Sequence, residues 1–273
     1  MLGRKQNTPD VDAWTAAREA AVRTYTPAAI DALLDTAADR ILAATPNRRA
    51  ALAWSGGKDS LVCELAARRA GIDDAVLVIS RLEYPAFLAW ATLNMPDGLT
   101  IVCRDQINET WLAAHPSMLF PHGNDGAAWF RHVQHAGQRD YARATGAALI
   151  LGRRTADGNH VGDPLPGGAR GYTDRAGTTR ISPIHDWPHE AVLAAIHHHH
   201  IDLPPCYSWP RGWQVGTGAW PARQWTTSRA HGWSEVWTID PEIVHRAAHL
   251  DLPDARHALH HLERGDDPCA ASD

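Results

Sequence analysis

The residues with the clearest capacity for chemistry lie between positions 55 and 60, where the sequence reads Ser55-Gly56-Gly57-Lys58-Asp59-Ser60. The apolar run 50–54 before them predicts a strand, and the amphipathic run 61–70 after them predicts a helix. A turn from strand to helix directs backbone N–H groups and the positive end of the helix dipole at an anion. The glycines let several amides converge on phosphate oxygens, and the lysine adds a compact positive charge. The segment, which we call the 55–60 loop, is therefore predicted to bind phosphate.

The spacing within this loop excludes the Walker A motif. That motif requires Gly-x-x-x-x-Gly-Lys-Ser/Thr, whereas here Asp59 follows Lys58 and Leu52 occupies the position of the first glycine. The six residues instead resemble the PP-loop, Ser-Gly-Gly-x-Asp-Ser, of the ATP pyrophosphatase and sulfonucleotide (PAPS) reductase superfamily. An ordinary turn is the alternative interpretation, because Ser, Gly and Asp are all common turn residues.

Two segments that follow other predicted strands extend the resemblance. Arg81-Leu82-Glu83-Tyr84-Pro85 is similar to the Glu-Phe/Tyr-Pro segment of PAPS reductase-like domains, which implies a nucleotide contact for Arg81 or Glu83. Gly152-Arg153-Arg154-Thr155 is similar to the family's Gly-Arg/Val-Arg-Arg segment, whose arginines contact the phosphate or sulfate end of the nucleotide. Paired guanidinium groups offer forked donors that suit phosphate oxygens. In both places a solvated turn is the alternative.

A third segment departs from the family. Residues 216–223 resemble its Gly-Cys-x-Pro-Cys-Thr-Arg segment, but Ala219 and Ala222 stand where iron–sulfur-bearing members have cysteines. Alanine cannot ligate iron, and residues 130–138, where the family has paired cysteines, contain none. The sequence therefore predicts no iron–sulfur cluster, and Arg223 is a candidate for binding the substrate or an anion.

The reductase nucleophile is also missing from its usual context. Reductases of this family use a C-terminal Glu-Cys-Gly-His-type motif, whose cysteine attacks the sulfonucleotide. Cys269 lies in the sequence Asp-Asp-Pro-Cys-Ala, without those neighbours and without the cationic surroundings that activate a thiol. We therefore interpret Cys269 as incidental and the chain as a family member that lacks the reductase apparatus.

Histidine and tryptophan are abundant, with 17 and 12 residues. The consecutive histidines 197–200 would spread around a helix end rather than converge on one ion, so no metal site is predicted. Four tryptophans alternate with Arg211 and Arg223 over residues 209–225, an arrangement that can stack nucleobases, although packing of an irregular segment also explains it. A nucleic-acid partner stays open but unsupported, because the net charge of -5 provides no basic footprint.

Length and composition describe an ordinary globular chain. The 273 residues suffice for one large domain with additions. No apolar run reaches membrane-spanning length, and residues 1–10 show no signal-peptide core, so no membrane association is expected. The four cysteines are dispersed without Cys-x-x-Cys spacing, which favours reduced thiols and a cytoplasmic protein.

Hydrophobic patterns predict strands that alternate with helices. The predicted strands are 50–54, 75–80, 99–103, 147–151 and 179–184. The predicted helices are 12–21, 27–44 (opened by Thr26-Pro27), 61–70, 84–93, 105–113, 127–145, 188–199, 241–249 and 254–264. Such alternation is typical of an α/β fold with a doubly wound parallel sheet, whose ligands bind beyond the carboxyl ends of the strands.

The resemblance implies a Rossmann-like, five-stranded parallel sheet in the order 3-2-1-4-5, with helical additions at both ends. We expect an N-terminal helical segment (1–46), a nucleotide-binding domain (47–230), and C-terminal helices with a polar tail (231–273). Residues 157–177 and 204–227, rich in Gly and Pro, are expected to be a mobile surface insertion and an irregular segment. The terminal helices could also form a homodimer interface.

The function that the resemblance implies is cleavage of ATP between its α- and β-phosphates, which adenylates an unidentified acceptor and releases pyrophosphate. The 55–60 loop would hold the pyrophosphate end, and Lys58 would stabilise charge on the leaving group. Asp59 would orient the loop or help to hold Mg²⁺, while Arg153 and Arg154 would bind phosphate or the activated substrate. The alternatives are a sulfonucleotide (PAPS or APS) reductase and a non-catalytic nucleotide-binding module.

Overall fold

A mixed sheet of seven strands forms the centre of the structure, a computed structural model that describes residues 11–265. The strands are β1 (Ala50–Ala53), β2 (Asp74–Ser80), β3 (Gly98–Arg104), β4 (Ala148–Ile150), β5 (Asp163–Pro164), β6 (Arg170–Thr173) and β7 (Thr179–Ser182). β3, β2, β1, β4 and β7 are neighbours in that order and run parallel, as the predicted five-strand order requires. β6 and β5 continue the sheet beyond β7 as antiparallel strands, so the prediction of a purely parallel, five-stranded sheet is incomplete.

The two additional strands come from residues 157–177, where the sequence predicted only a surface insertion. Tyr172 on β6 pairs with Arg180 on β7, and Asp163 on β5 pairs with Gly171 on β6. β5 has two residues and β6 has four, so neither is long enough to show a clear alternation of polar and apolar residues. The segment is built into the edge of the sheet.

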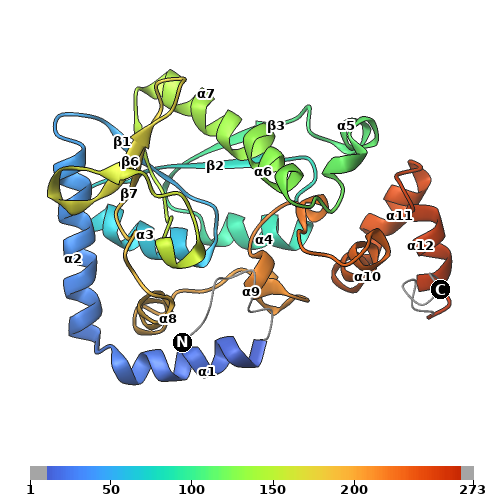
Figure 1. The fold of residues 1–273 in the computed structure, drawn as a ribbon, viewed down its shortest axis with the longest axis horizontal. Helices are drawn as coiled ribbons and strands as arrows, with labels where there is room; N and C mark the ends of the chain where they lie inside the picture. The colour runs from blue at the N-terminus through green and yellow to red at the C-terminus, as the bar shows by residue number, and fades with distance from the viewer. Residues whose placement is uncertain (1–10, 266–273) are drawn as a thin grey trace.

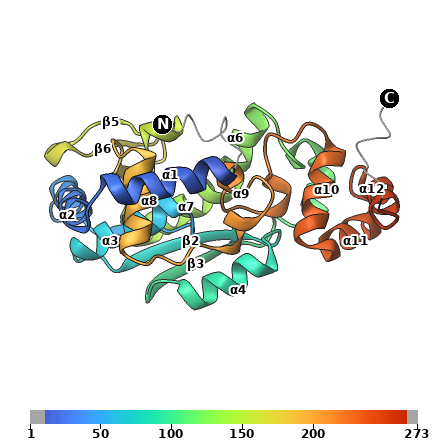
Figure 2. The same cartoon turned by 90° about the horizontal axis from the view of Figure 1, so that it is seen from below.

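Helices cover both faces of the sheet. α6 and α7 lie on one side of the strands, whereas α3 and α8 lie on the other (Figure 1). The helices are α1 (Val11–Thr24), α2 (Pro27–Ala44), α3 (Lys58–Arg69), α4 (Pro85–Asn94), α5 (Glu109–Ala114), α6 (Asn124–Phe130), α7 (Ala136–Thr145), α8 (His189–His198), α9 (Gly212–Val215), α10 (Arg229–Ile239), α11 (Pro241–His249) and α12 (Ala255–Leu262). Figure 2 shows α1 crossing α8, and the two helices contact each other.

Several helices differ from the sequence prediction: α3 begins at Lys58 rather than at residue 61, α5 begins at Glu109 rather than at residue 105, and α9 was not predicted. The helix predicted over 127–145 begins at Asn124 and contains a π-helical segment, Arg131–His135, between α6 and α7. α10 was not predicted at all. Its sequence mixes Gly232 and two tryptophans with polar residues, so it has no clear apolar stripe.

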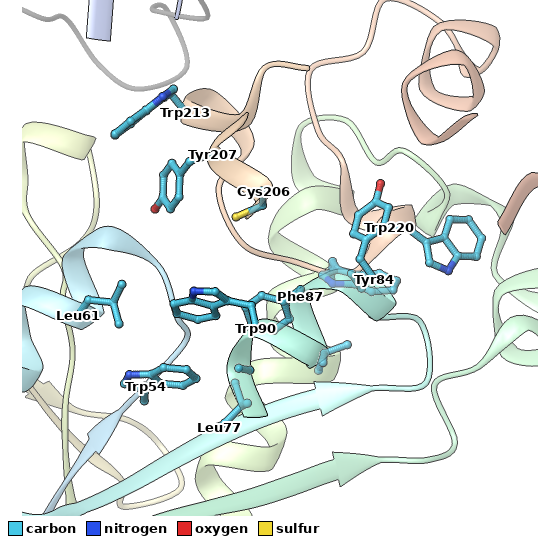
Figure 3. Packing of buried hydrophobic residues seen from close by; sticks show 14 of the residues in the cluster. Trp54, Leu61, Leu77, Tyr84, Phe87, Trp90, Cys206, Tyr207, Trp213 and Trp220 are labelled. Atoms are coloured by element: carbon cyan, nitrogen blue, oxygen red, sulfur yellow. The ribbon is translucent and has the colours of Figure 1, made fainter. Parts of the chain in front are cut away.

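Aromatic packing ties the irregular segment 204–227 to the rest of the core (Figure 3). Trp213 stacks on Trp14 with ring centroids 5.1 Å apart, and Trp209 lies 4.6 Å from Tyr84. Trp220 lies 5.7 Å from Trp233 of α10. The packing interpretation of this tryptophan-rich segment is therefore confirmed for these rings. Trp225 differs, because 42% of its surface is exposed.

The C-terminal helices α10, α11 and α12 form a group at one end of the molecule, away from most of the sheet (Figure 1). Trp233 anchors this group, because its ring meets Phe120 edge-on at 5.2 Å. Among residues 11–265, no helix is both long enough and apolar enough to cross a membrane. Within the same residues, no group of three or more His, Cys, Asp or Glu side chains is arranged to hold a metal ion.

Candidate active site

The 55–60 loop connects β1 to α3 at the carboxyl end of β1. The chain continues from β1 to β2 on one side and returns to β4 on the other, and such a switch in strand order is where doubly wound sheets bind ligands. Gly56 has a φ of +66°, which favours glycine. The Ser60 hydroxyl donates to the Gly57 carbonyl at 2.9 Å and accepts from the Ser55 N–H at 3.2 Å. These bonds hold the loop in a closed turn.

Lys58 lies at the first position of α3 and is almost completely buried, with 1% of its surface exposed. Its Nζ lies 2.6 Å from Oδ2 of Asp59. Its backbone N–H donates to the hydroxyl of Tyr207 at 2.7 Å, so a residue from the segment after α8 contacts the loop directly. The ammonium group is therefore fixed within the loop rather than extended into solvent.

Arg154 forms an ion pair with Asp59 and so holds the Lys58–Asp59 pair in place. The side chain has no exposed surface, and its Nε donates to Oδ1 of Asp59 at 2.8 Å. Nη2 donates to Oδ2 of Asp157 at 2.9 Å, and Nη1 donates to the Trp187 carbonyl at 3.1 Å. Burial alone would lower the pKa of Arg154, but the charges of Asp59 and Asp157 raise it. Arg154 thus stays charged and holds two carboxylates in place.

His189 borders the same network. Its Nδ1 lies 3.2 Å from Nη2 of Arg154. Burial lowers the pKa of His189, and the charges of Arg154 and Lys58 lower it further. The imidazole is therefore neutral at pH 7, and it adds no positive charge to the network.

Gly152 allows the strand end that carries Arg154 to approach the loop. A Cβ at this position would lie 2.6 to 2.8 Å from backbone atoms of Asp59 and Ser60, which is closer than carbon atoms tolerate. The role of Gly152 in the structure is thus close packing against the start of α3.

A cavity of about 440 Å³ opens beside the loop. This volume falls within the roughly 300–1,000 Å³ of small-molecule sites. Its walls come from the end of β1, from β2, from the helix 124–145 and from segments 157–159 and 215–225. Polar side chains that line it are those of Ser55, Asp59, Glu83, Gln134, Gln138, Asp157, Asn159, Thr217 and Gln224. The arrangement offers apolar surface for a ring system next to a loop suited to phosphate.

Glu83 is the cavity residue with the clearest acid–base character. Burial raises the pKa of its carboxyl to about 7, although hydrogen bonds from the N–H and hydroxyl of Ser80 oppose the rise. A group with a pKa near 7 can accept or release a proton at neutral pH. Glu83 lies in the cavity wall, and a nucleotide contact for it stays a prediction.

We expect Glu83→Gln to stabilise the protein more at pH 8 than at pH 5. The folded-state pKa of about 7 lies above the ordinary glutamate value of 4.5, so between these values the folded state binds more protons than the unfolded state. The free energy of unfolding therefore falls as pH rises through this window, and glutamine removes that fall. Urea denaturation midpoints at both pH values measure the difference. Glu19→Gln, on the exposed part of α1, should act equally at both; equal shifts for Glu83→Gln would contradict the prediction.

Two predicted arginines are held in ion pairs with acidic residues outside the cavity lining. Arg81 is exposed and forms an ion pair with Asp105 at 2.5 Å. Arg223 is buried, and its Nε donates to Glu235 of α10 at 2.9 Å, beside a second pair between Arg211 and Glu235. Neither guanidinium lines the cavity. In the structure Arg223 fixes the irregular segment to α10, so its charge is already balanced.

Asp157 and Tyr207 are site residues that the sequence reasoning missed. Asp157 lines the cavity and accepts from Arg154, and its signal was an acid three residues after the Arg-Arg pair. Tyr207 reaches the loop from 149 positions further along the chain. Its segment carried no motif, so no local pattern could have indicated this contact.

The oxygen atoms near the loop fit the Mg²⁺ ion that the family resemblance implies. Oδ1 of Asp157 is buried and has no hydrogen-bond partner among the described residues. Mg²⁺ prefers oxygen ligands and is usually held by one or two carboxylates together with substrate phosphates. Asp157, with Asp59 beside it, would hold the ion, which when bound would neutralise phosphate charge.

The fold and the loop together define a class: a doubly wound α/β protein with a Ser-Gly-Gly-x-Asp-Ser loop at the switch in strand order. A PAPS reductase from Candida auris, in a phosphate complex, is similar in structure with a TM-score of 0.47 and 16% sequence identity, covering 72% of this chain and 96% of that one. The U34-tRNA thiolase NcsA from Methanococcus maripaludis, with its 4Fe-4S cluster, is similar with a TM-score of 0.43 and 12% identity, covering 86% of this chain and 78% of that one. Neither a protein-family model nor a curated protein sequence matches the chain.

Proposed function

We propose that the protein binds ATP, or a related adenine nucleotide, and cleaves it at the α-phosphate to adenylate a second substrate. The observation that supports this most is the buried Lys58 ammonium, held 2.6 Å from Asp59 in a loop that borders a cavity of nucleotide size. A fixed positive charge stabilises a transition state more than a mobile one, because it need not reorganise during the reaction.

The proposed reaction is an in-line displacement. An oxygen of the acceptor attacks the α-phosphorus, and the bond from that phosphorus to the bridging oxygen breaks. Pyrophosphate leaves with the electron pair, and the amides of the 55–60 loop and Lys58 stabilise its charge. Glu83 is suited to take the proton of the acceptor, since its pKa of about 7 matches that task.

The thiols of the described residues support this reaction over a sulfonucleotide reductase. Cys63 and Cys206 are buried, and Cys103 is exposed on β3. Burial raises the pKa of Cys63, and burial together with Asp105 raises the pKa of Cys103. A reductase needs a thiolate nucleophile at the substrate, and none of these three lines the cavity. Cys269, which we interpret from the sequence as incidental, lies outside the residues that the structure describes.

Product analysis tests the proposal. The protein would be incubated with ATP, Mg²⁺ and panels of hydroxyl, carboxyl and amide compounds, and AMP and pyrophosphate would be quantified. With the correct acceptor class, the amount of pyrophosphate should equal the sum of the adenylated acceptor, detected by its mass, and any AMP later released from it. A parallel incubation with PAPS and reduced thioredoxin should release no sulfite. Sulfite release, or release of ADP and phosphate instead of AMP and pyrophosphate, would count against the proposal.

A further inference from the structure

Two aromatic side chains of the cavity wall differ from the others because they are exposed to solvent. Phe130, at the end of α6, is 38% exposed, and Trp225 is 42% exposed. The other aromatic rings that line the cavity are only 1 to 4% exposed, namely those of Trp54, Phe87 and Trp129. The two exposed rings therefore lie at the mouth of the cavity, and we call them the aromatic pair.

Trp225 is held in its exposed position by its neighbours along the chain. The Gln224 carbonyl accepts a hydrogen bond from Nη1 of Arg211 at 2.7 Å, and Arg211 is itself paired with Glu235. On the other side of the tryptophan, Thr226 is buried. Because both flanking residues are fixed, the backbone at Trp225 is fixed as well, and its ring stays at the mouth of the cavity.

The backbone conformation of Trp225 is itself unfavourable. Its φ of +60° lies in the left-handed region, which residues with a bulky side chain rarely adopt. Such strain persists only where the surrounding structure enforces it, and it is concentrated at sites that bind ligands. The exposed ring also leaves a large apolar surface in water. Two unfavourable features at one residue indicate that the exposed ring has a role in binding.

Gly126 sets the distance between the two segments that carry the aromatic pair. The Gln224 side chain packs against this glycine so closely that a Cβ there would lie 2.7 Å from Oε1 of the amide. Phe130 follows Gly126 by four positions in α6 and therefore lies on the same face of the helix. The segment that carries Trp225 is thus held about one helical turn from Phe130, and the two rings border the mouth from different segments.

The charges of the cavity wall disfavour an anionic ring. Among residues 11–265 no lysine, arginine or histidine lines the cavity, whereas Asp59, Glu83 and Asp157 do. Arg153, for which the sequence predicted a nucleotide contact, donates to the Tyr172 hydroxyl at 2.7 Å and is outside the lining. The faces of tryptophan rings attract cations. The mouth of the cavity therefore suits a ring that is neutral or positively charged.

We infer that the aromatic pair binds a planar ring, neutral or positively charged, that belongs to the second substrate. Planar rings stack on aromatic side chains with little regard to their substituents. The amides of Gln134, Gln138 and Gln224 also line the cavity, and they can both donate to and accept from polar groups on the edge of such a ring. The ring site stands on its own geometry, whereas its assignment to the acceptor rests on the proposed function, in which the nucleotide fills the inner part of the cavity beside the 55–60 loop.

Titration calorimetry with four probes of one carbon skeleton tests the ring site. The probes are 2-naphthylmethanol, its decahydro analogue, (2-naphthylmethyl)trimethylammonium and 2-naphthoate. The neutral and the cationic naphthyl probes should bind about tenfold more tightly than the saturated alcohol and the carboxylate, equivalent to about 1.4 kcal/mol. Tighter binding of 2-naphthoate, or equal binding of the saturated alcohol, would overturn the inference.

Paired variants show whether the planar rings themselves are responsible. Trp225→Leu and Phe130→Leu keep apolar bulk without a planar ring, and each should weaken binding of 2-naphthylmethanol about tenfold. Trp225→Phe and Phe130→Tyr keep a ring and should stay within about threefold of the wild type. Leucine and phenylalanine are both unbranched at Cβ, so the two variants at position 225 carry similar backbone strain. Equal affinities for the leucine and the aromatic variants would contradict stacking.

An analogue that cannot be cleaved, α,β-methylene-ATP, identifies which molecule carries the ring. If the ring belongs to the acceptor, 2-naphthylmethanol should bind with unchanged affinity in the presence of saturating analogue and Mg²⁺. If the analogue displaces the probe, the aromatic pair binds adenine, and the assignment to the second substrate is overturned. If the analogue does not bind at all, the proposed function fails and the assignment to an acceptor fails with it, whereas the ring site is still decided by the paired variants.

Discussion

Lys58→Gln is expected to lower the rate of pyrophosphate release from ATP by about 100- to 1,000-fold, the loss typical when one fixed donor to a developing charge is removed. The dissociation constant of ATP should rise much less, because the loop amides still bind phosphate in the ground state. Steady-state kinetics and equilibrium binding of ATP measure the two effects separately.

The control for Lys58→Gln is Arg68→Gln, which removes a positive charge from the opposite end of α3, where it pairs with Glu64. This change should leave both turnover and binding unchanged. If Lys58→Gln instead weakened ATP binding and turnover by the same factor, Lys58 would contribute to uniform binding and not to the transition state. If the Lys58→Gln protein cleaved ATP at the wild-type rate, Lys58 would have no role in the reaction.

Arg154→Met is expected to destabilise the protein by about 3 to 5 kcal/mol, the cost of breaking a buried ion pair by removing one partner. The guanidinium has no exposed surface and binds both Asp59 and Asp157, so its loss removes an ion pair from Asp157 and leaves Asp59 with Lys58. Urea denaturation at pH 7 measures the change in the free energy of unfolding.

Arg49→Met provides the matched comparison for Arg154→Met. Arg49 pairs with Asp74 at 2.7 Å, but 52% of its side chain and 39% of that of Asp74 are exposed, and exposed pairs contribute about 0 to 1 kcal/mol. A loss of less than about 1 kcal/mol for Arg154→Met would show that water solvates the two carboxylates.

The elements that could be predicted from sequence are those whose signals are local. β2 contains a continuous apolar run and β3 begins directly after a Pro-Asp turn, and both strands were predicted within one residue at each end. Thr26 accepts from the N–H of Ala29, and Pro27 begins α2, as the capping pattern indicated. The 55–60 loop was correctly predicted to join β1 to α3, because its motif and both flanking patterns are contiguous, although residues 58–60 already form the first turn of α3.

The features that escaped prediction depend on contacts between distant residues. Arg223 was a candidate for binding an anion because of the family resemblance, and no local pattern indicates its ion pair with Glu235 of α10. Arg180 attracted no attention, since a lone arginine in a short strand has no motif, and its contacts with Tyr172 and Asp174 depend on the pairing of β6 and β7. The sequence therefore indicates the chemistry of the loop. It does not indicate which residues line the cavity, because they are brought together only by tertiary contacts.

The π-helical segment Arg131–His135 makes the cavity sensitive to deletion. Removing one residue within it would rotate the preceding part of the helix relative to the following part by roughly 100° and shorten it by about 1.5 Å. Trp129, which precedes the segment, would then change its angular position relative to Gln138, which follows it, and both line the cavity. The number of residues in this helix is thus constrained, because it determines which side chains face the cavity.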